Sequence, residues 1–379
     1  MARFSRTAHK AERTHTNAFQ THSTRTFTMA TQTASRKQGS TQARIQGRSI
    51  AVVGATGLVG RTILDRLEAR KFPVKKLLPV ASKNSVGKTI TFCGEPIKVI
   101  SMEDAIAQKP EIALFAAGGK TSKDFAPKFA EAGTLVIDNS SNFRMDPNVP
   151  LVVPEINLED IQPEHFIVAN PNCSTIQLVM ALKPLHDRFI VRRAIVSTYQ
   201  SVSGTGQAAL DQLNGERAGR EVAKVYPHSI DMNCLPHCDV FLENDFTREE
   251  MKLHHETKKI LGDQSISISA TSVRVPAVGG HSESVYLELD RDFSIPDVRE
   301  ALKMFPGIVV QDKPGENLYP MPISAQGKDD VFVGRIRRDL TEIQGLHLWI
   351  VSDNLHKGAA TNALQIAEYL NKAGRFSKS

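Results

Sequence analysis

The chain has 379 residues, of which 41% are hydrophobic and 23% charged, and its formal net charge is +6. This length favours two domains, and every apolar run is shorter than the about 18–20 residues that a membrane-spanning helix needs, which excludes that class. Residues 1–47 hold eight Lys or Arg and one Glu, a charge of +7, so the remainder carries −1 and is not expected to bind nucleic acid.

The basic leader, residues 1–47, is rich in Thr, Ser, Gln and Arg and shows no sustained apolar periodicity. It is predicted to be disordered, because it offers too little apolar surface to offset its ordering entropy. Its composition is also typical of an organelle transit peptide, whereas it lacks the apolar core of a secretory signal. We favour a tail or a start-codon artefact, with Met29 as the start, and we expect a cytoplasmic protein.

Ordered structure is predicted to begin with an apolar strand at residues 49–53. The glycine loop Gly54-x-x-Gly57-x-x-Gly60 follows, and then a helix with apolar residues every four positions from Val59 to Leu67. Glycines at such a turn let a pyrophosphate approach the helix N-terminus closely. The spacing differs from GxGxxG, but the strand–loop–helix context favours a dinucleotide site over a glycine turn without a ligand.

Further apolar strands are predicted at residues 76–80, 112–116, 135–138 and 165–169, with a helix at residues 121–132. Alternation of apolar strands with helices is typical of a parallel sheet that helices cover on both faces. The sequence therefore predicts an α/β fold, with a Rossmann-type dinucleotide-binding domain at residues 48–172.

The residues after the second strand bear on the choice of nicotinamide cofactor. Residues 82–85 read Ser-Lys-Asn-Ser, and residues 80–88 contain no acid. An acid at this place accepts from the ribose 2′-OH of NAD, whereas hydroxyls and cations suit a 2′-phosphate. The sequence therefore favours NADP.

The candidate nucleophile is Cys173, which follows an Asn-Pro-Asn turn where a helix is predicted to begin. Unpaired amides and the helix dipole favour the thiolate there, and a thiolate attacks carbonyl carbon. A small buried residue that only packs is the alternative, and this segment alone leaves both open. With Cys93, Cys234 and Cys238, and no secretory signal, the cysteines indicate a reducing compartment. Cys234, His237 and Cys238 are too crowded, without a second Cys/His pair, to predict a metal site.

After Cys173 the predicted strands at residues 190–200, 265–276, 282–290, 331–337 and 346–352 alternate polar and apolar residues more strongly. They predict a mostly antiparallel sheet with helices on one face. Glu249 and Lys252, three apart on a predicted helix, share a face. An amphipathic helix at residues 356–371 is expected to return to the first domain. Residues 353–379 would then complete that domain, and residues 173–352 would be an inserted α+β catalytic and dimerisation domain.

Several stretches in this order resemble the aspartate-semialdehyde dehydrogenase family. They are residues 54–60, 138–144, 170–175, 199–204, 242–244, 249–252, 274–276 and 280–282. The resemblance runs from about Arg48 to the C-terminus. It implies an enzyme that reduces L-aspartyl-4-phosphate to L-aspartate-4-semialdehyde with NADPH, through a cysteine thioacyl intermediate, in lysine, threonine and methionine biosynthesis. It also implies a homodimer, with a tetramer left open.

The resemblance assigns roles to particular residues. Cys173 would be the acyl-accepting nucleophile, Gln200 would orient the substrate, and His281 would be the general acid/base. Arg274 would bind the substrate α-carboxylate and Glu249 its amino group. The phosphate would be held by Arg144, Asn172 and Lys252. The dinucleotide would contact Gly54, Thr56, Gly57, Leu58, Val59, Asn84, Ser85, Ser203, Gly204 and Asn354.

One position departs from the family, and some alternatives stay open. Many bacterial members carry an arginine where this chain has Asn84, which leaves strict NADP selectivity open, with Lys83 as the candidate substitute. A malonyl-CoA reductase reuses the same core. N-acetyl-glutamyl-phosphate reductase and glyceraldehyde-3-phosphate dehydrogenase have other sequences around the nucleophile than this chain has. A non-catalytic dinucleotide sensor is disfavoured, since a sensor does not need Cys173, Gln200, Arg274 and His281 together.

Overall fold

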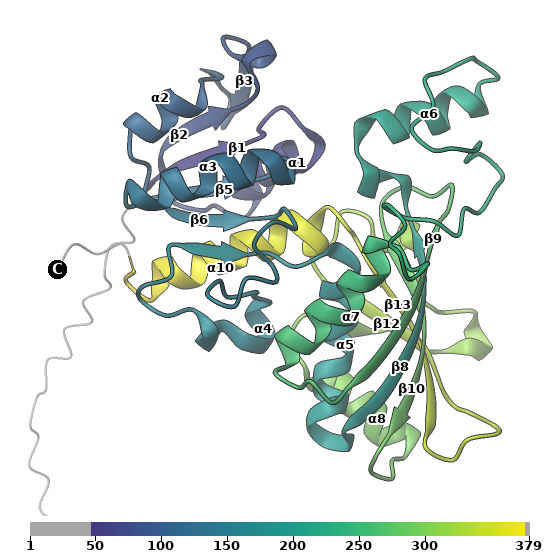
Figure 1. Cartoon of the computed structure of the whole chain (residues 1–379). Coiled ribbons are helices and arrows are strands. Elements are labelled where there is room, and N and C mark those ends of the chain that lie inside the picture. The colour runs from purple at the N-terminus through teal and green to yellow at the C-terminus, as the bar shows by residue number, and fades with distance from the viewer. Residues whose placement is uncertain (1–46, 376–379) are drawn as a thin grey trace, which may run out of the picture. The chain divides into compact units, whose positions relative to one another are not determined.

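The computed structural model describes residues 47–375. The predicted leader, apart from Gly47, and residues 376–379 lie outside the described residues. The described chain opens with a five-stranded sheet in the order β2-β1-β5-β6-β7 (Figure 1). Its strands are β1 (Arg48–Val53), β2 (Val74–Val80), β5 (Ile112–Phe115), β6 (Leu135–Asp138) and β7 (Ile167–Ala169). All four pairings are parallel, as predicted.

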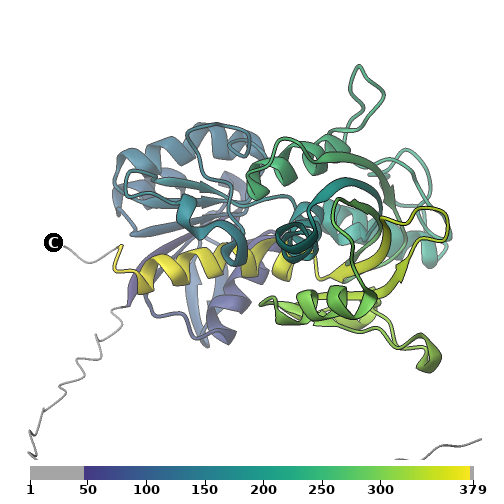
Figure 2. The ribbon, with the colours of Figure 1, turned by 90° about the horizontal axis from the view of Figure 1, so that it is seen from below.

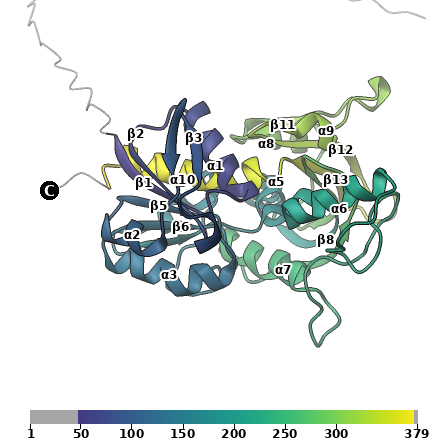
Figure 3. The same ribbon diagram turned by 90° about the horizontal axis from the view of Figure 1, so that it is seen from above.

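Apolar residues on both faces of these strands explain why helices cover both sides of the sheet. Ile50 and Val52 share a core with α1 (Leu58–Ala69) and α10 (Thr361–Lys372), whereas Ala51 and Val53 face α2 (Met102–Ala107) and α3 (Gly119–Glu131). Figure 3 shows the two pairs of helices on opposite sides. The α/β class with a Rossmann-like parallel sheet is therefore confirmed.

The C-terminal segment packs where its amphipathic pattern predicts. It begins with one π-helical turn, His356–Ala360, and continues as α10, whose apolar side joins the core around β1. Figure 2 shows this helix, in yellow, against the purple and blue strands and helices of the first sheet. A π turn is a local widening that often accompanies a functional site.

The second sheet has six strands in the order β11-β12-β13-β10-β8-β9. They are β8 (Val191–Gln200), β9 (Ser267–Arg274), β10 (His281–Leu289), β11 (Ile308–Val310), β12 (Val331–Arg338) and β13 (Gly345–Ser352). The central pairings are antiparallel, as predicted, but β8 with β9 and β11 with β12 are parallel. The sheet is therefore mixed: the crossover from β8 to β9 contains α7 (Arg248–Leu261), and residues 311–330 connect β11 to β12, whereas α8 (Ile295–Met304) lies between β10 and β11.

One face of this sheet is covered by α5 (Cys173–Phe189), α7 and α8, which form one large apolar core with it. A separate small cluster forms around α6 (Gln207–Arg217). The remaining short elements are the hairpin β3 (Thr89–Phe92) and β4 (Glu95–Lys98), the helices α4 (Pro154–Asn157) and α9 (Pro322–Ala325), and the 3-10 turns Lys83–Ser85, Leu158–Asp160, Val202–Thr205 and Pro314–Glu316. No helix within residues 47–375 is both long and apolar enough to cross a membrane.

Candidate active site

Most of the predicted site residues line one cavity of about 400 Å³. These lining residues are Val59, Arg144, Asn172, Cys173, Gln200, Ser203, Gly204, Glu249, Lys252, Arg274 and Asn354. His281 is fully buried beside them, and Gly54, Thr56, Gly57, Leu58, Asn84 and Ser85 lie outside the lining. Residues from both sheets thus meet at one place.

Cys173 is the first residue of α5, as predicted, and its surroundings favour the neutral thiol. Asn172 caps the helix, and its side-chain oxygen accepts from the amides of Ser174 (3.0 Å) and Thr175 (3.2 Å). Burial and the nearby Glu249 raise the pKa of Cys173 to about 12, against the opposing effect of the surrounding cations. Burial and Glu249 thus favour the thiol over the predicted thiolate, and the amides of Ser174 and Thr175 are already bound by the cap.

The backbone of the π turn lies directly against the nucleophile. A Cβ built on Gly358 would stand 2.8 Å from Cβ of Cys173, a distance that real Cβ atoms do not show. Only glycine fits at this position without displacing the cysteine.

Glu249 is the centre of a buried polar network in the cavity lining. Its Oε1 accepts from Asn172 Nδ2 (2.9 Å) and Gln200 Nε2 (3.1 Å), and its Oε2 lies 2.8 Å from Lys252 Nζ. Burial raises the pKa of Glu249, but the charge and hydrogen bond of Lys252, with the amide of Asn172, lower it to about 2. The group is a carboxylate at neutral pH, which suits an ammonium ligand.

Gln200 is held at the end of β8 by this network. Its Nε2 donates to Ser174 Oγ (3.0 Å) as well as to Glu249, so the amide orientation is fixed from two sides. Its carbonyl oxygen remains the polar atom that the side chain can present to a ligand.

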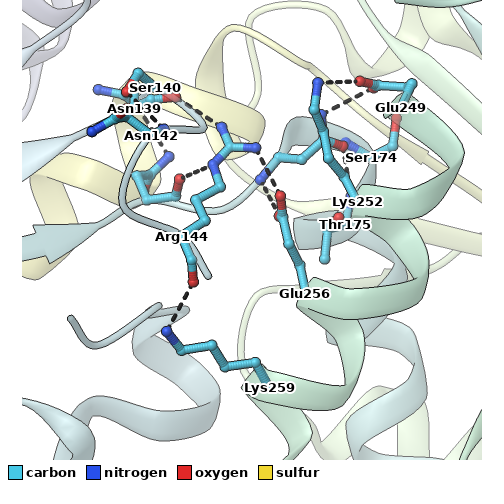
Figure 4. A network of polar contacts seen from close by, with 12 residues as sticks. Asn139, Ser140, Asn142, Arg144, Ser174, Thr175, Glu249, Lys252, Glu256 and Lys259 are labelled. Carbon is cyan, nitrogen blue, oxygen red and sulfur yellow. Dashed lines mark hydrogen bonds and ion pairs between the residues drawn. The ribbon is translucent and has the colours of Figure 1, made fainter. Parts of the chain in front are cut away.

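Arg144 is anchored by three contacts, shown in Figure 4 with the Lys252–Glu249 pair. Nη1 pairs with Glu256 (2.9 Å), Nε donates to Asn170 O (2.9 Å), and Nη2 donates to Asn139 O (2.8 Å). A guanidinium has five N–H donors, so one on each Nη remains for an anion. The predicted phosphate-binding role fits this geometry, whereas Asn172 mainly caps α5 and binds Glu249.

Arg274 and His281 converge on Gly204. Nη1 of Arg274 and Nε2 of His281 each lie 3.1 Å from the point where a Gly204 Cβ would stand. Nη1 donates to Ser201 O (2.7 Å), and within the described chain Nε of Arg274 has no hydrogen-bond partner. A buried guanidinium with a free N–H edge is suited to a carboxylate ligand.

The hydrogen bond to His281 defines its tautomer. The backbone amide of Ser201 donates to Nδ1 (3.0 Å), so Nδ1 carries no proton and the neutral ring is protonated on Nε2. Burial and the charge of Arg274 lower the pKa of His281 to about 3. Nε2 has no partner within residues 47–375. The neutral ring of His281 thus presents an N–H donor next to Arg274.

The glycine loop has the shape of a dinucleotide cradle. Gly54 has φ +85°, and a Cβ on Gly60 would stand 2.0 Å from the carbonyl oxygen of Gly54, so the loop closes only with glycine at both positions. Gly57 begins α1 without a side-chain cap, and the first turn contains no acid. The first amides of the helix therefore favour a phosphate.

The remaining predicted cofactor residues lie in two places. Ser203 Oγ donates to Asn354 Oδ1 (3.0 Å), and both residues line the cavity. Asn84 and Ser85 belong to the 3-10 turn after β2, where Lys83 and Asn84 are exposed.

Several residues of the site were not predicted. Glu256 holds both Arg144 and the amide of Asn172 (2.7 Å), and Asp239 binds Lys252 (2.8 Å). The spacing of Glu249, Lys252 and Glu256 on α7 places all three on one helical face and could have indicated Glu256. No local pattern marks Asp239, which lies in a loop.

No group of three or more His, Cys, Asp or Glu among residues 47–375 is arranged to hold a metal ion. Cys234 is exposed and Cys238 is buried.

Comparisons with known proteins agree on one family. The model "Semialdehyde dehydrogenase, NAD binding domain" matches residues 49–163, and "Semialdehyde dehydrogenase, dimerisation domain" matches residues 182–357. The aspartate-semialdehyde dehydrogenase of Aquifex aeolicus is 52% identical over 338 residues, which cover 86% of this chain and 99% of that protein.

Two solved structures are similar over the same region. Aspartate semialdehyde dehydrogenase II of Vibrio cholerae, complexed with ASA, has a TM-score of 0.82 and 44% identity, covering 86% of this chain and 99% of that one. The Candida albicans enzyme with NADP has a TM-score of 0.70 and 26% identity, covering 87% and 100%.

Proposed function

The chain belongs to the aspartate-semialdehyde dehydrogenase family, and on that premise we propose that it reduces L-aspartyl 4-phosphate to L-aspartate 4-semialdehyde and phosphate, using NADPH. The reaction is reversible and serves lysine, threonine and methionine biosynthesis. The observation that carries the proposal is the single cavity in which Cys173, Arg274 and Glu249 meet. A nucleophile, a carboxylate-binding cation and an ammonium-binding anion are what this substrate requires.

The substrate is held at both ends of its amino-acid portion. The free N–H edge of Arg274 binds the α-carboxylate, and the carboxylate of Glu249 binds the α-ammonium. The two remaining Nη hydrogens of Arg144, with Lys252, bind the phosphate group. The acyl carbon is thereby placed at Cys173, with the orientation kept by Gln200.

The thiol of Cys173 then attacks the acyl carbon, and its proton passes to the leaving phosphate oxygen as the C–O bond to phosphate breaks. A thioacyl-enzyme and hydrogen phosphate result. The Nε2–H of His281 stabilises the oxyanion that develops on the carbonyl oxygen. Bound NADPH supplies the hydride that reduces the thioester. The Nε2–H of His281 also hydrogen-bonds the oxyanion of the resulting tetrahedral thiohemiacetal. Collapse of this oxyanion re-forms the C=O bond, breaks the C–S bond and releases the aldehyde, and the departing cysteine sulfur takes up a proton from solvent.

The cofactor site is proposed from the fit of the residues to NADP. The glycine loop 54–60 would hold the pyrophosphate at the N-terminus of α1, and Ser203, Gly204 and Asn354 would contact the nicotinamide end. Lys83, with Asn84 and Ser85, would meet the 2′-phosphate. We propose residues 48–172 with 353–379 as the dinucleotide-binding domain and residues 173–352 as the catalytic and dimerisation domain.

The chain acts as a homodimer, in keeping with its dimerisation domain. We propose that the helix-free face of the second sheet forms the interface, because Ile195 and Tyr199 stand 39% and 38% exposed there. We further propose a cytoplasmic location, which suits four free cysteines. Sedimentation of the protein and fractionation of its native cells test these two points.

The activity is tested by following NADPH oxidation with aspartyl phosphate, and NADP reduction with the semialdehyde and phosphate. We expect turnover in both directions, and none with Cys173→Ala. Malonyl-CoA serves as the competing substrate: turnover with malonyl-CoA and none with aspartyl phosphate would refute the proposal.

A further inference from the structure

Glu283 is a buried carboxyl group that the proposed reaction does not use. It lies on β10, two residues after His281 and therefore on the same face of the strand, and it is 0% exposed. A carboxyl group without a partner is costly at such a depth. Its position next to His281 on the same face of β10 suggests that it helps to position the residues of the proposed reaction.

The strand registers arrange the buried polar residues in two rows under the helices. Gln200 pairs with Arg274 across β8 and β9, and His281 pairs with Ser352 across β10 and β13. One step further from the cavity, Thr198 lies between Ser272 and Glu283. The row beyond is apolar and includes Val196 and Val285. The second polar row thus separates the catalytic row from the hydrophobic core.

Helix α5 faces both rows with its first two turns. Ser174 contacts Gln200 of the first row, and Gln177 lies beside Glu283 of the second. Since Gln177 is four residues after Cys173, the two side chains share a helical face. A link between Gln177 and Glu283 therefore fixes the turn that carries the nucleophile.

The second row contains several polar atoms that lack partners. Within residues 47–375, no hydrogen bond of ordinary geometry is made by Glu283 Oε1 or Oε2, Gln177 Nε2, Thr198 Oγ1 or Ser272 Oγ, although the Gln177 amide is close enough to Glu283 to lower its pKa. Nearly all buried polar groups in proteins are hydrogen-bonded to protein or to internal water. A cluster with both donors and acceptors is the kind of place that binds an internal water.

The charge state of Glu283 follows from its surroundings. Burial raises the pKa of Glu283 well above its ordinary range, and the amide of Gln177 opposes this only in part. These are the only two causes, so no cation or other titratable group of the described chain balances a negative charge. A neutral carboxylic acid has one donor and an acceptor, which matches its polar neighbours.

We propose that Glu283 is a positioning residue that, as a neutral acid, joins Gln177, Thr198 and an internal water into a layer that holds Cys173 in register with Gln200 and His281. The expected effect on turnover rests on the proposed function, whereas the existence of the polar layer does not depend on that function. An error of 1 Å in the placement of a reacting group costs about 10²-fold in rate, so loss of the layer should lower kcat and leave KM less changed.

Three variants test this in the full-length protein. Glu283→Gln keeps a neutral hydrogen-bonding group, and we expect kcat within about 3-fold of the parent and an unchanged pH profile. Glu283→Leu removes the polar group, and we expect kcat to fall about 10- to 100-fold with KM changed less than about 3-fold. Val285→Ala, in the apolar row of the same strand and face, is the matched control. It should lower the thermal midpoint without changing the pH profile.

Two measurements do not depend on substrate turnover. The infrared spectrum of the parent should contain a protonated-carboxyl C=O band that disappears in Glu283→Gln, and iodoacetamide should modify Cys173 at the same rate in both. If Glu283→Gln loses as much activity as Glu283→Leu, an ionised carboxylate is required and the proposal is wrong. Parental kinetics in Glu283→Leu, or no such band, would also overturn it. Absence of activity in the parent would instead count against the proposed function. The infrared band of the protonated carboxyl group would still test whether the polar layer exists.

Discussion

Single residues determine how the site keeps its reactive groups neutral until a substrate binds. Burial and Glu249 hold Cys173 as a thiol, and the amide of Ser201 holds His281 as a neutral Nε2–H donor. Glu249 is paired with Lys252, whereas Nε of Arg274 has no hydrogen-bond partner within the described chain. In the proposed reaction the substrate's ammonium and carboxylate groups would meet Glu249 and Arg274.

The reactivity of Cys173 in the resting protein should follow its raised pKa. Only the thiolate is alkylated, so below a pKa of about 12 its rate should rise about tenfold per pH unit. Iodoacetamide labelling from pH 6 to pH 9, followed by peptide mass spectrometry, measures this. The exposed Cys93 and Cys234 provide internal references in the same digest. A plateau below pH 8 would show that the thiol is already activated.

Arg274 should be irreplaceable by lysine. Arg274→Lys keeps the charge but loses the planar donor edge and the bond to Ser201 O, so we expect kcat/KM to fall about 10²-fold or more. Steady-state kinetics with aspartyl phosphate measure it. Arg188→Lys, at the far, exposed end of α5, should leave kcat/KM unchanged. Equal effects of both substitutions would remove Arg274 from the substrate site.

Elements far apart in the chain supply the frame of the site. The π turn before α10 places Gly358 against Cys173, and β8 and β9 end at Gln200 and Arg274 where β10 begins at His281. Because strands are stiff and their registers fixed, one helix end and three strand ends define the geometry. The π turn leaves no room for a side chain at Gly358, because a Cβ there would collide with Cys173.

Gly358→Ala should move the nucleophile without changing its chemistry. A Cβ there would stand 2.8 Å from Cβ of Cys173, so either the turn or α5 must shift. We expect kcat to fall about 10²-fold while NADP affinity, measured by fluorescence titration, stays near the parental value. Gly315→Ala, where a Cβ meets nothing within 4 Å, is the control. A fully active Gly358→Ala protein would contradict the close contact.

At the scale of the whole molecule, a charged cluster around Asp329 connects the segment before β12 with helices that pack on the first sheet. This loop residue pairs with Arg66 (3.3 Å) and Arg70 (3.0 Å) near the end of α1, and it accepts from Thr361 (2.6 Å) of α10. Burial raises the pKa of Asp329, but His356, Thr361 and the two arginines lower it overall. The cluster links the dinucleotide domain to the second one.

The sign of its pH dependence follows from the lowered pKa. A carboxyl group with a lower pKa in the folded state stabilises the protein above its unfolded pKa of about 3.9, and this is lost as pH falls through the folded value. Asp329→Asn should therefore lower stability by about 1–3 kcal/mol at pH 7. The difference from the parent should shrink below about pH 4. Calorimetry at several pH values tests this, and a pH-independent difference would contradict it.

Much of this molecule could be predicted from the sequence. Apolar strands such as residues 112–115 must be buried on both faces, which implies a helix-covered parallel sheet, and the motif around Cys173 implies the nucleophile. The neutral state of Cys173 could not be predicted, because it depends on how Asn172, Glu249 and buried apolar atoms surround it in space. The charged cluster around Asp329 could not be predicted for the same reason, since its partners lie far away in the chain.

The parallel edges of the second sheet are a further example. Strand alternation indicates which face of β9 or β11 is buried, but chain direction depends on the crossover helices between strands. Short elements such as the β3–β4 hairpin carry too few residues for a periodic signal.

The central claim is that the acyl group passes through the sulfur of Cys173. The most direct test mixes the enzyme with aspartyl phosphate without NADPH and measures intact mass and released phosphate together. We predict one aspartyl group per chain, mapped to the peptide that contains Cys173, and an equal amount of released phosphate. In Cys173→Ser we predict no adduct that thioester-cleaving conditions release. Turnover with the acyl group on another residue, or with no covalent adduct at all, would contradict the account.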